Sequence, residues 1–417
     1  MTANIVDRFS DLPDDVLKHI ISLLSERELM RLSILSTRWR KVCSPLPCLY
    51  LDLREYESRL TKLEVSADKD NFVRKILSPC ETLHLYMFRL ISDDSHWQQY
   101  VASSITESVV MKFSPRIVSI DVPSCYSHEV SISSIFSCKF LEELYLTFSD
   151  CKHRPRKHYI VQMPRVKALF SLRKLHLKNA TFYYGTICRI LSRCPEIEDL
   201  SLKSCCIKES WILHEKLKFL SLDDCSIGDP YDKSKLSICA PSLASLKFAS
   251  SPDRTVLMNF PFLSYASVDV RKEYCYDNIF NSLSSIQHLE LCSSNLKAVL
   301  DKQLSKLPRF ANLKSLSLNG WCMACHLGPV VWFLENSTNL EKLTLCLNRQ
   351  HCLVKNKTKE NIFVRDHPDP RQTEVIQSKL LKKVELRLSI SYKKCNGPTI
   401  SFFKKVKGLE NAQFVIC

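Results

Sequence analysis

Apolar residues, mostly leucine, recur along this chain in the spacing L-x-x-L-x-L, with polar residues between them. An alternation with a period of two indicates a short β-strand that has one buried side and one polar side. The starts of clear copies lie between 20 residues (Ile197 to Leu217) and 31 residues (Leu141 to Leu172) apart. The pattern therefore predicts many short strands, each followed by a connection that returns the chain. The clearest copies begin at Leu141, Leu172, Ile197, Leu217, Leu243, Ile286, Leu313 and Leu340, and looser ones at Ile117, Leu263, Leu381 and Leu409, with Leu83 and Leu85 as a candidate first copy.

Some copies extend into a longer pattern, in which a cysteine follows the strand. Cys205 and Cys225 each come three residues after the last leucine of a copy, and Cys125 holds the same place after Val122. This spacing resembles the consensus of leucine-rich repeats, which has asparagine or cysteine at that position. The resemblance implies a solenoid over residues 80–417 whose strands form a parallel sheet on the concave side. It also implies that these thiols are packing residues.

The residues between the leucines face the polar side of the predicted sheet. They are mixed in charge and type, which favours a protein partner over a nucleic acid, because a phosphate track would be uniformly basic. Most such positions are expected to be solvated surface, and the pattern alone does not single out the ones that bind. We expect the residues that bind a target protein to be among Tyr145, His176, Lys247, Glu290, Thr344 and Glu385.

Residues 9–45 have a different period. Pro13 and the two aspartates after it fit the first turn of a helix, and Leu17, Ile20, Ile21 and Leu24 then follow at helical spacing. Ser25 and Glu28 have the spacing of a capping box that starts a second helix. A third short helix around Trp39 is expected to end before Pro45. So small a three-helix module buries little surface alone and needs a neighbour or a partner.

The residues of this module resemble the F-box, in the form found in plant F-box/leucine-rich-repeat proteins. The matching segments are Leu12-Pro13-Asp14-Asp15-Val16-Leu17 and Leu32-Ser33-Ile34-Leu35-Ser36-Thr37-Arg38-Trp39-Arg40. The resemblance implies that the module binds a Skp-type adaptor and, through it, a cullin. The alternative is that its apolar residues only form the module's own core. The positions expected to contact the adaptor are Leu12, Pro13, Val16, Leu17, Ile20, Leu32, Leu35 and Trp39.

Glycine usage argues against the common cofactor enzymes. The chain has only six glycines, against roughly thirty for average usage. Dinucleotide, phosphate-loop and nucleophile-elbow motifs, which all need closely spaced glycines, are therefore absent from the sequence. We expect no catalytic residue, no cofactor and no metal.

The chain contains twenty cysteines. The N-terminus has no apolar run typical of a secretory signal, and no stretch approaches the roughly 18 apolar residues of a membrane span. We therefore expect an intracellular protein, in the nucleus, the cytoplasm or both, whose thiols stay reduced.

Two further features could carry chemistry. Cys322-Met323-Ala324-Cys325-His326 matches the haem-attachment pattern, but it follows a predicted strand and fits the turn of a repeat. Cys346, His351 and Cys352 lack convincing zinc-ligand spacing. The polar and basic segment at about 348–378 is expected to be a loop inserted into the solenoid. Residues 380–412 weakly resemble the FBD-type ending of many plant F-box/leucine-rich-repeat proteins.

The expected fold class is α/β, with a three-helix F-box at 8–50, a connection at 51–79 and the leucine-rich-repeat solenoid at 80–417. The leading hypothesis is a non-catalytic subunit of a Skp–cullin–F-box ubiquitin ligase that recognises a target protein not identifiable from the sequence. A second hypothesis is a repeat protein that binds its partner outside a ligase. The net charge of +15 motivates a third, a binder of nucleic acid or another polyanion.

Overall fold

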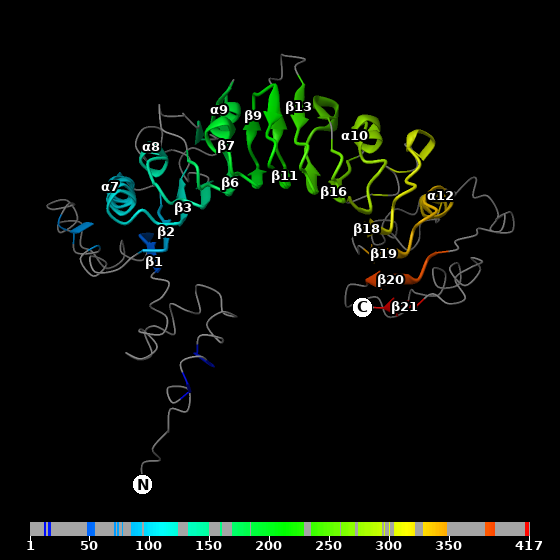
Figure 1. Ribbon diagram of the computed structural model, residues 1–417, viewed down its shortest axis with the longest axis horizontal. Coiled ribbons are helices and arrows are strands. Elements are labelled where there is room, and N and C mark those ends of the chain that lie inside the picture. Colours follow the sequence, from blue (N-terminus) through cyan, green and yellow to red (C-terminus); the bar gives the residue numbers. More distant parts are fainter. Residues whose placement is uncertain are drawn as a thin grey trace, which may run out of the picture. The chain divides into compact units, whose positions relative to one another are not determined.

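The computed structural model describes the repeat strands and many of their connections (Figure 1). The described residues are 12–13, 16–17, 48–54, 71, 73–74, 77, 85–93, 96–123, 132–149, 159–160, 169–183, 185–228, 235–258, 260–271, 274–293, 296, 300, 304–321, 328–347, 380–387 and 413–416. They belong to two compact units. The N-terminal unit is Met1–Thr181 with Ser192–Ile197, and the C-terminal unit is Phe182–Leu191 with Glu198–Cys417. The boundary between the units thus falls inside the predicted repeats.

The C-terminal unit is built on parallel strands that follow one another in chain order, as the repeats predict. In β8 and β11, Leu200 and Leu202 pair in register with Leu220 and Leu222, and all four are buried. Each buried leucine stabilises the fold by roughly 2 kcal/mol, so the register of the sheet is set by the apolar positions. The strands are β8 (Asp199–Lys203), β11 (Phe219–Asp223), β14 (Ser245–Ala249), β16 (Tyr265–Asp269), β17 (His288–Cys292), β18 (Ser315–Trp321), β19 (Lys342–Leu347), β20 (Lys383–Arg387) and β21 (Gln413–Ile416).

The N-terminal unit carries the same arrangement, and it begins earlier than the sequence pattern predicts. Its parallel strands are β1 (Cys48–Asp52), β2 (Met87–Ile91), β3 (Ile117–Pro123), β4 (Glu143–Ser149) and β6 (Lys174–Lys178). β1 lies where the end of the F-box and the start of a connection are expected from the sequence, and it pairs in parallel with β2. In β2 the repeat starts at Leu85, with Phe88 and Leu90 buried in the two leucine positions.

Small polar side chains close the ends of several strands. Asn179 Nδ2 donates to the carbonyl oxygen of Phe148 at 2.7 Å, and Ser250 Oγ donates to that of Leu222 at 3.3 Å. The Cys225 thiol donates to the carbonyl oxygen of Leu202 at 3.2 Å. Hydrogen bonding with the neighbouring Cys205 thiol, together with burial, raises the pKa of Cys225. The interpretation of Cys205 and Cys225 as packing residues is therefore confirmed, because both are buried and a thiolate is disfavoured there.

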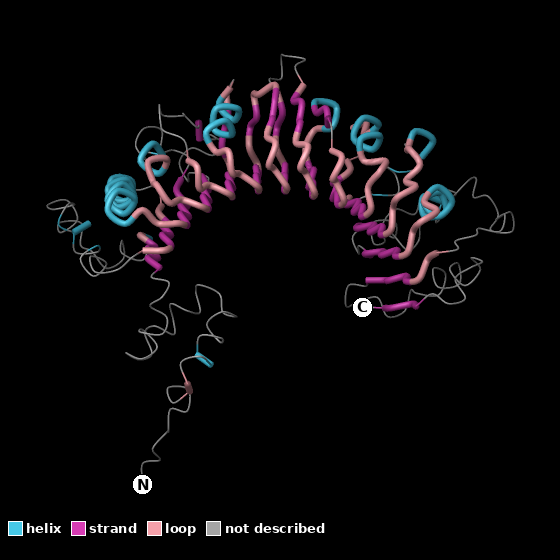
Figure 2. Tube along the Cα trace, viewed as in Figure 1, coloured by secondary structure: helices cyan, strands magenta, loops and turns pink. Residues whose placement is uncertain are grey.

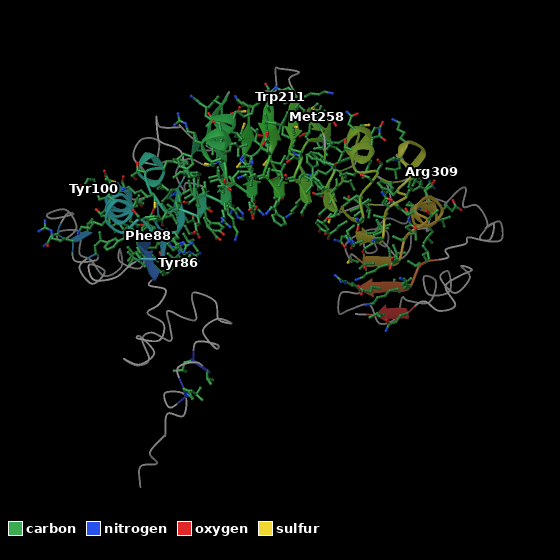
Figure 3. All side chains as sticks on the ribbon, in the orientation of Figure 1. Tyr86, Phe88, Tyr100, Trp211, Met258 and Arg309 are labelled. Carbon is green, nitrogen blue, oxygen red and sulfur yellow. The ribbon has the colours of Figure 1, made fainter. Side chains whose placement is uncertain are left out.

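Further elements connect the strands and form a second layer (Figure 2). In the C-terminal unit, β10, β13 and β15 form a small parallel sheet, and Ser282 of α10 donates to the Leu257 carbonyl in β15 at 3.3 Å. Trp211 and Met258 lie on this second sheet, on the side away from β11 and β14 (Figure 3). The elements are the helices α7 (His96–Phe113), α8 (Ile132–Ile135), α9 (Thr186–Arg193), α10 (Asp277–Ser282) and α12 (Gly328–Asn336), the 3-10 turns η2 (Pro252–Arg254) and η3 (Leu304–Lys306), and the short strands β5 (Tyr159–Ile160), β7 (Ala180–Phe182), β9 (Cys206–Ile207), β10 (Trp211–Leu213), β12 (Ser226–Ile227), β13 (Leu236–Cys239) and β15 (Thr255–Met258).

Candidate binding face

The side of the main strands that carries the residues between the buried leucines is called here the polar face. The strand register arranges these residues in rows that cross the strands. In the C-terminal unit one row holds four of the expected target-binding positions. This central row consists of Ser201, Ser221, Lys247, Ser267, Glu290, Ser317, Thr344 and Glu385.

Glu385 lies at the centre of a charged cluster on β19 and β20. Its carboxylate is within 3.2 Å of Lys342 Nζ, 2.7 Å of Lys383 Nζ and 3.2 Å of Arg387 Nη2, and its side chain is only 7% exposed. Thr344 Oγ1 adds a hydrogen bond of 3.4 Å. The hydrogen bond from Lys383, followed by that from Lys342 and by the positive charge of both lysines, lowers the pKa of Glu385 to about 2. Glu385 is thus ionised at every physiological pH.

This lowered pKa predicts a pH dependence of stability. In the unfolded chain Glu385 titrates near 4.5, so between that pH and about 2 the unfolded state binds more protons than the folded state. The stabilisation by the cluster is therefore complete above pH 4.5 and is lost as the pH falls towards 2. We expect Glu385→Gln to be less stable than the wild type at pH 7, with the difference shrinking as the pH falls, in urea unfolding measured from pH 2 to 7. Parallel curves for the two proteins would contradict the assignment.

Glu290, on β17, has neutral neighbours instead. Tyr265 donates its hydroxyl to Glu290 Oε2 at 2.5 Å, and the Asn319 amide donates to Oε1. Burial, followed by the nearby Glu290 carboxylate, raises the pKa of Tyr265 to about 12, so the phenol remains a donor. Among the described residues, no cation forms an ion pair with Glu290.

Lys247 lies among acidic neighbours. Its Nζ is 3.6 Å from Asp223 Oδ2, and Lys203 Nζ is 2.9 Å from the same atom. Farther along the face, Arg271 Nε is 3.6 Å from Asp269. The described part of the polar face therefore alternates in sign, as the sequence predicts, and does not form a uniformly basic track.

In the N-terminal unit the register brings Tyr145 and His176 together on β4 and β6. Their rings meet edge to face with centroids 4.9 Å apart, and the Tyr145 hydroxyl donates to Glu143 Oε2 at 2.6 Å. Lys174 Nζ is 2.7 Å from the same carboxylate. Although burial acts to raise the pKa of Glu143, the hydrogen bonds from Lys174 and Tyr145 lower it. Both expected positions are therefore occupied by contacts within the unit, and their contact with a target stays a prediction.

Three cations that flank the central row, Lys342, Lys383 and Arg387, do not stand out in the sequence. They occupy the first or last position of a strand, and a pattern centred on the leucines gives these positions no weight. The available signal was a cation at the position just before the first of the last two leucine sites in two successive copies, at Lys342 and Lys383. The register places those two side by side.

The structure describes four of the expected adaptor-binding positions. Val16 and Pro13 are exposed, Val16 by 43%, whereas Leu12 is half-buried and Leu17 is fully buried. The amides of Val16 and Leu17 both donate to the Pro13 carbonyl at 3.0 Å, which is the first helical turn that the proline predicts. Ile20, Leu32, Leu35 and Trp39 lie outside the described residues, as do the Cys322–His326 motif, the expected loop at 348–378 and most of the segment resembling an FBD ending.

Strands that repeat the L-x-x-L-x-L pattern, pair in parallel in chain order and present a polar face define a leucine-rich-repeat protein. Comparison with protein families agrees: an F-box domain model matches residues 9–50, and the model described as "At1g61320/AtMIF1, LRR domain" matches residues 80–410. The chain belongs to this leucine-rich-repeat family and carries an F-box domain.

Similar proteins from Arabidopsis thaliana carry the same combination in their names. FBD-associated F-box protein At4g10400 is 25% identical over 82% of this chain and 77% of its own length. F-box/FBD/LRR-repeat protein At1g78750 shows the same identity over the same shares, and FBD-associated F-box protein At5g38590 is 28% identical over 70% of this chain and 68% of its own. Within the described residues, no helix has the length and apolar character needed to cross a bilayer.

Proposed function

We propose that this chain is the target-recognition subunit of a Skp–cullin–F-box ubiquitin ligase. The observation that carries the proposal is the presence, in one chain, of an F-box match at 9–50 and a leucine-rich-repeat match at 80–410. The F-box would bind a Skp-type adaptor and, through it, a cullin, and the polar face of the repeats would bind a target protein. Such a subunit needs no catalytic residue, because it acts by holding the target close to an enzyme that other subunits carry.

The described residues of the F-box support a contact with an adaptor. Val16 is an apolar side chain that remains 43% exposed, next to the exposed Pro13. Exposed apolar side chains at the start of an amphipathic helix suit a helix-in-groove interface, where burial by the partner supplies the binding free energy. Leu17, which is fully buried in the chain, also supports the module's own core.

Val16→Asp therefore tests the proposal with little risk to folding. We expect the wild-type full chain to co-purify with a Skp-type adaptor, and Val16→Asp to bind it more weakly by about 2 kcal/mol, roughly thirtyfold in Kd. Phe262→Asp is the matched control, since Phe262 is also exposed but lies in the C-terminal unit and should leave adaptor binding unchanged. Binding is measured by calorimetry, with circular dichroism to confirm folding.

The outcome also separates the alternatives. Leu17→Asp combined with Ile20→Asp should abolish adaptor binding by disrupting the module itself. A folded wild-type chain that does not bind any Skp-type adaptor would reject the ligase role and leave a repeat protein that acts outside a ligase.

A further inference from the structure

The polar face of the C-terminal unit carries two charged stations of opposite sign. The cationic station consists of Lys342, Lys383 and Arg387, grouped around the single carboxylate of Glu385. Three positive charges and one negative charge leave a net charge of +2. Among the described residues, no second carboxylate pairs with these cations, and all three remain between 37% and 56% exposed. The station can therefore accept an external anion.

The acidic station is Glu290. Its two described partners, the Tyr265 hydroxyl and the Asn319 amide, are neutral donors that hold the carboxylate in place without cancelling its charge. The side chain is partly exposed on the polar face. A carboxylate that is oriented by fixed hydrogen bonds loses little conformational entropy when it meets a cation. Glu290 is thus arranged to bind a basic group.

The space between the stations is lined by small hydroxyl side chains. Glu290, Ser317, Thr344 and Glu385 occupy consecutive positions of the central row on β17 to β20. Three strand steps of about 4.8 Å separate the two stations by roughly 14 Å. A chain in extended conformation advances about 3.3 Å per residue, so it covers this distance in about four residues. Ser317 and Thr344 leave room for its backbone.

We propose that the target protein presents to this face an extended segment with a basic residue and an acidic residue about four positions apart. The inference rests on the proposed function, since it describes the segment by which a target would be recognised. The basic residue pairs with Glu290, and the acidic residue is held by Lys342, Lys383 and Arg387. A polyanion such as nucleic acid fits less well, because it would meet the Glu290 carboxylate beside the cationic station.

Selection from a displayed library of random 12-residue peptides by the full chain tests this pairing. The wild type should enrich peptides with Lys or Arg and Asp or Glu three to five positions apart, over peptides in which the two charges are adjacent. Glu290→Gln keeps the hydrogen-bonding shape of the side chain and removes only its charge, so the preference for the basic residue should disappear. Lys383→Ser combined with Arg387→Ser leaves Glu385 paired with Lys342 and should remove the preference for the acidic residue.

The matched control is Lys382→Ser. Lys382 loses the same charge but lies before β20 and pairs with Glu341 at 2.8 Å, so this variant should select as the wild type does. Affinity for a selected peptide, measured by fluorescence polarisation at about 150 mM salt, should fall about threefold to fivefold on loss of either station.

Three results would overturn the inference: no enrichment of spaced opposite charges, the same enrichment in both station variants, or enrichment of acidic residues alone. Adaptor binding is measured on the same preparations. All of these variants should retain it, so a failure of peptide selection is distinct from a failure of the ligase role.

Discussion

Gly320→Ala should destabilise the C-terminal unit by about 4 kcal/mol or more, the largest loss expected from any single methyl group in the described chain. Gly320 lies in β18 with φ +89°, and a Cβ there would come within 1.8 Å of the carbonyl oxygen of Ser293. That carbonyl belongs to backbone tied to the same strand, since the Ser293 amide donates to the Asn319 carbonyl at 3.1 Å. The register between β18 and β19 also shifts at this point, between Asn319 and Trp321. The backbone therefore cannot move aside without breaking the strand end.

Gly185→Ala is the matched control for this prediction. Gly185 has φ +75°, but nothing lies within 4 Å of the position that an added methyl group would take, so the substitution adds backbone strain without a clash. It should cost only about 1 kcal/mol. The measurement is the urea midpoint followed by circular dichroism. Equal midpoints for the two variants would show that the backbone at Ser293 yields, contrary to the prediction.

The repeat strands could be predicted from the sequence because leucine spacing reports burial directly. The copy that begins at Ile197 predicts buried Leu200 and Leu202, and the strand is found there. The first strand was missed although Leu46-Pro47-Cys48-Leu49-Tyr50-Leu51 has the same spacing, because its prolines suggested only the end of the helical module. In β2 an aromatic residue, Phe88, fills a leucine site and hides the copy.

The second sheet of the C-terminal unit was not predicted. Trp211–Leu213 is too short for its alternation to stand out, and its partners in β13 lie more than twenty residues later in the chain. The site shows the same limit. The sequence identifies Glu385 as facing the polar side, but its enclosure by Lys342 depends on a pairing across 41 residues of the chain, which the spacing of leucines does not encode.

A buried carboxylate in the connections has a structural role that the sequence pattern also does not reveal. Glu209 is only 4% exposed, and it accepts hydrogen bonds from the amide of Gly185 at 2.7 Å and from that of Ile187 at 3.0 Å. These amides lie at the start of α9, where the helix has free N–H groups and a partial positive charge. The side chain therefore caps the helix from a segment more than twenty residues away in sequence.

Glu209→Ala should lower the free energy of unfolding by about 2–3 kcal/mol, because it leaves two amides without their charged acceptor in a buried place. Glu209→Gln keeps one acceptor oxygen and turns an NH₂ group towards the other amide, so it should recover less than half of the loss. Glu198→Ala serves as the control, since it removes only a half-exposed ion pair with Lys218 at 3.1 Å and should cost less than about 1 kcal/mol. Hydrogen exchange at the Gly185 and Ile187 amides gives the specific readout: exchange should accelerate in Glu209→Ala and stay unchanged in Glu198→Ala. If both alanine variants are equally mild and both amides remain protected, the helix does not depend on this carboxylate, and its stability comes from the packing of Ile187, Ile190 and Leu191 against the core instead.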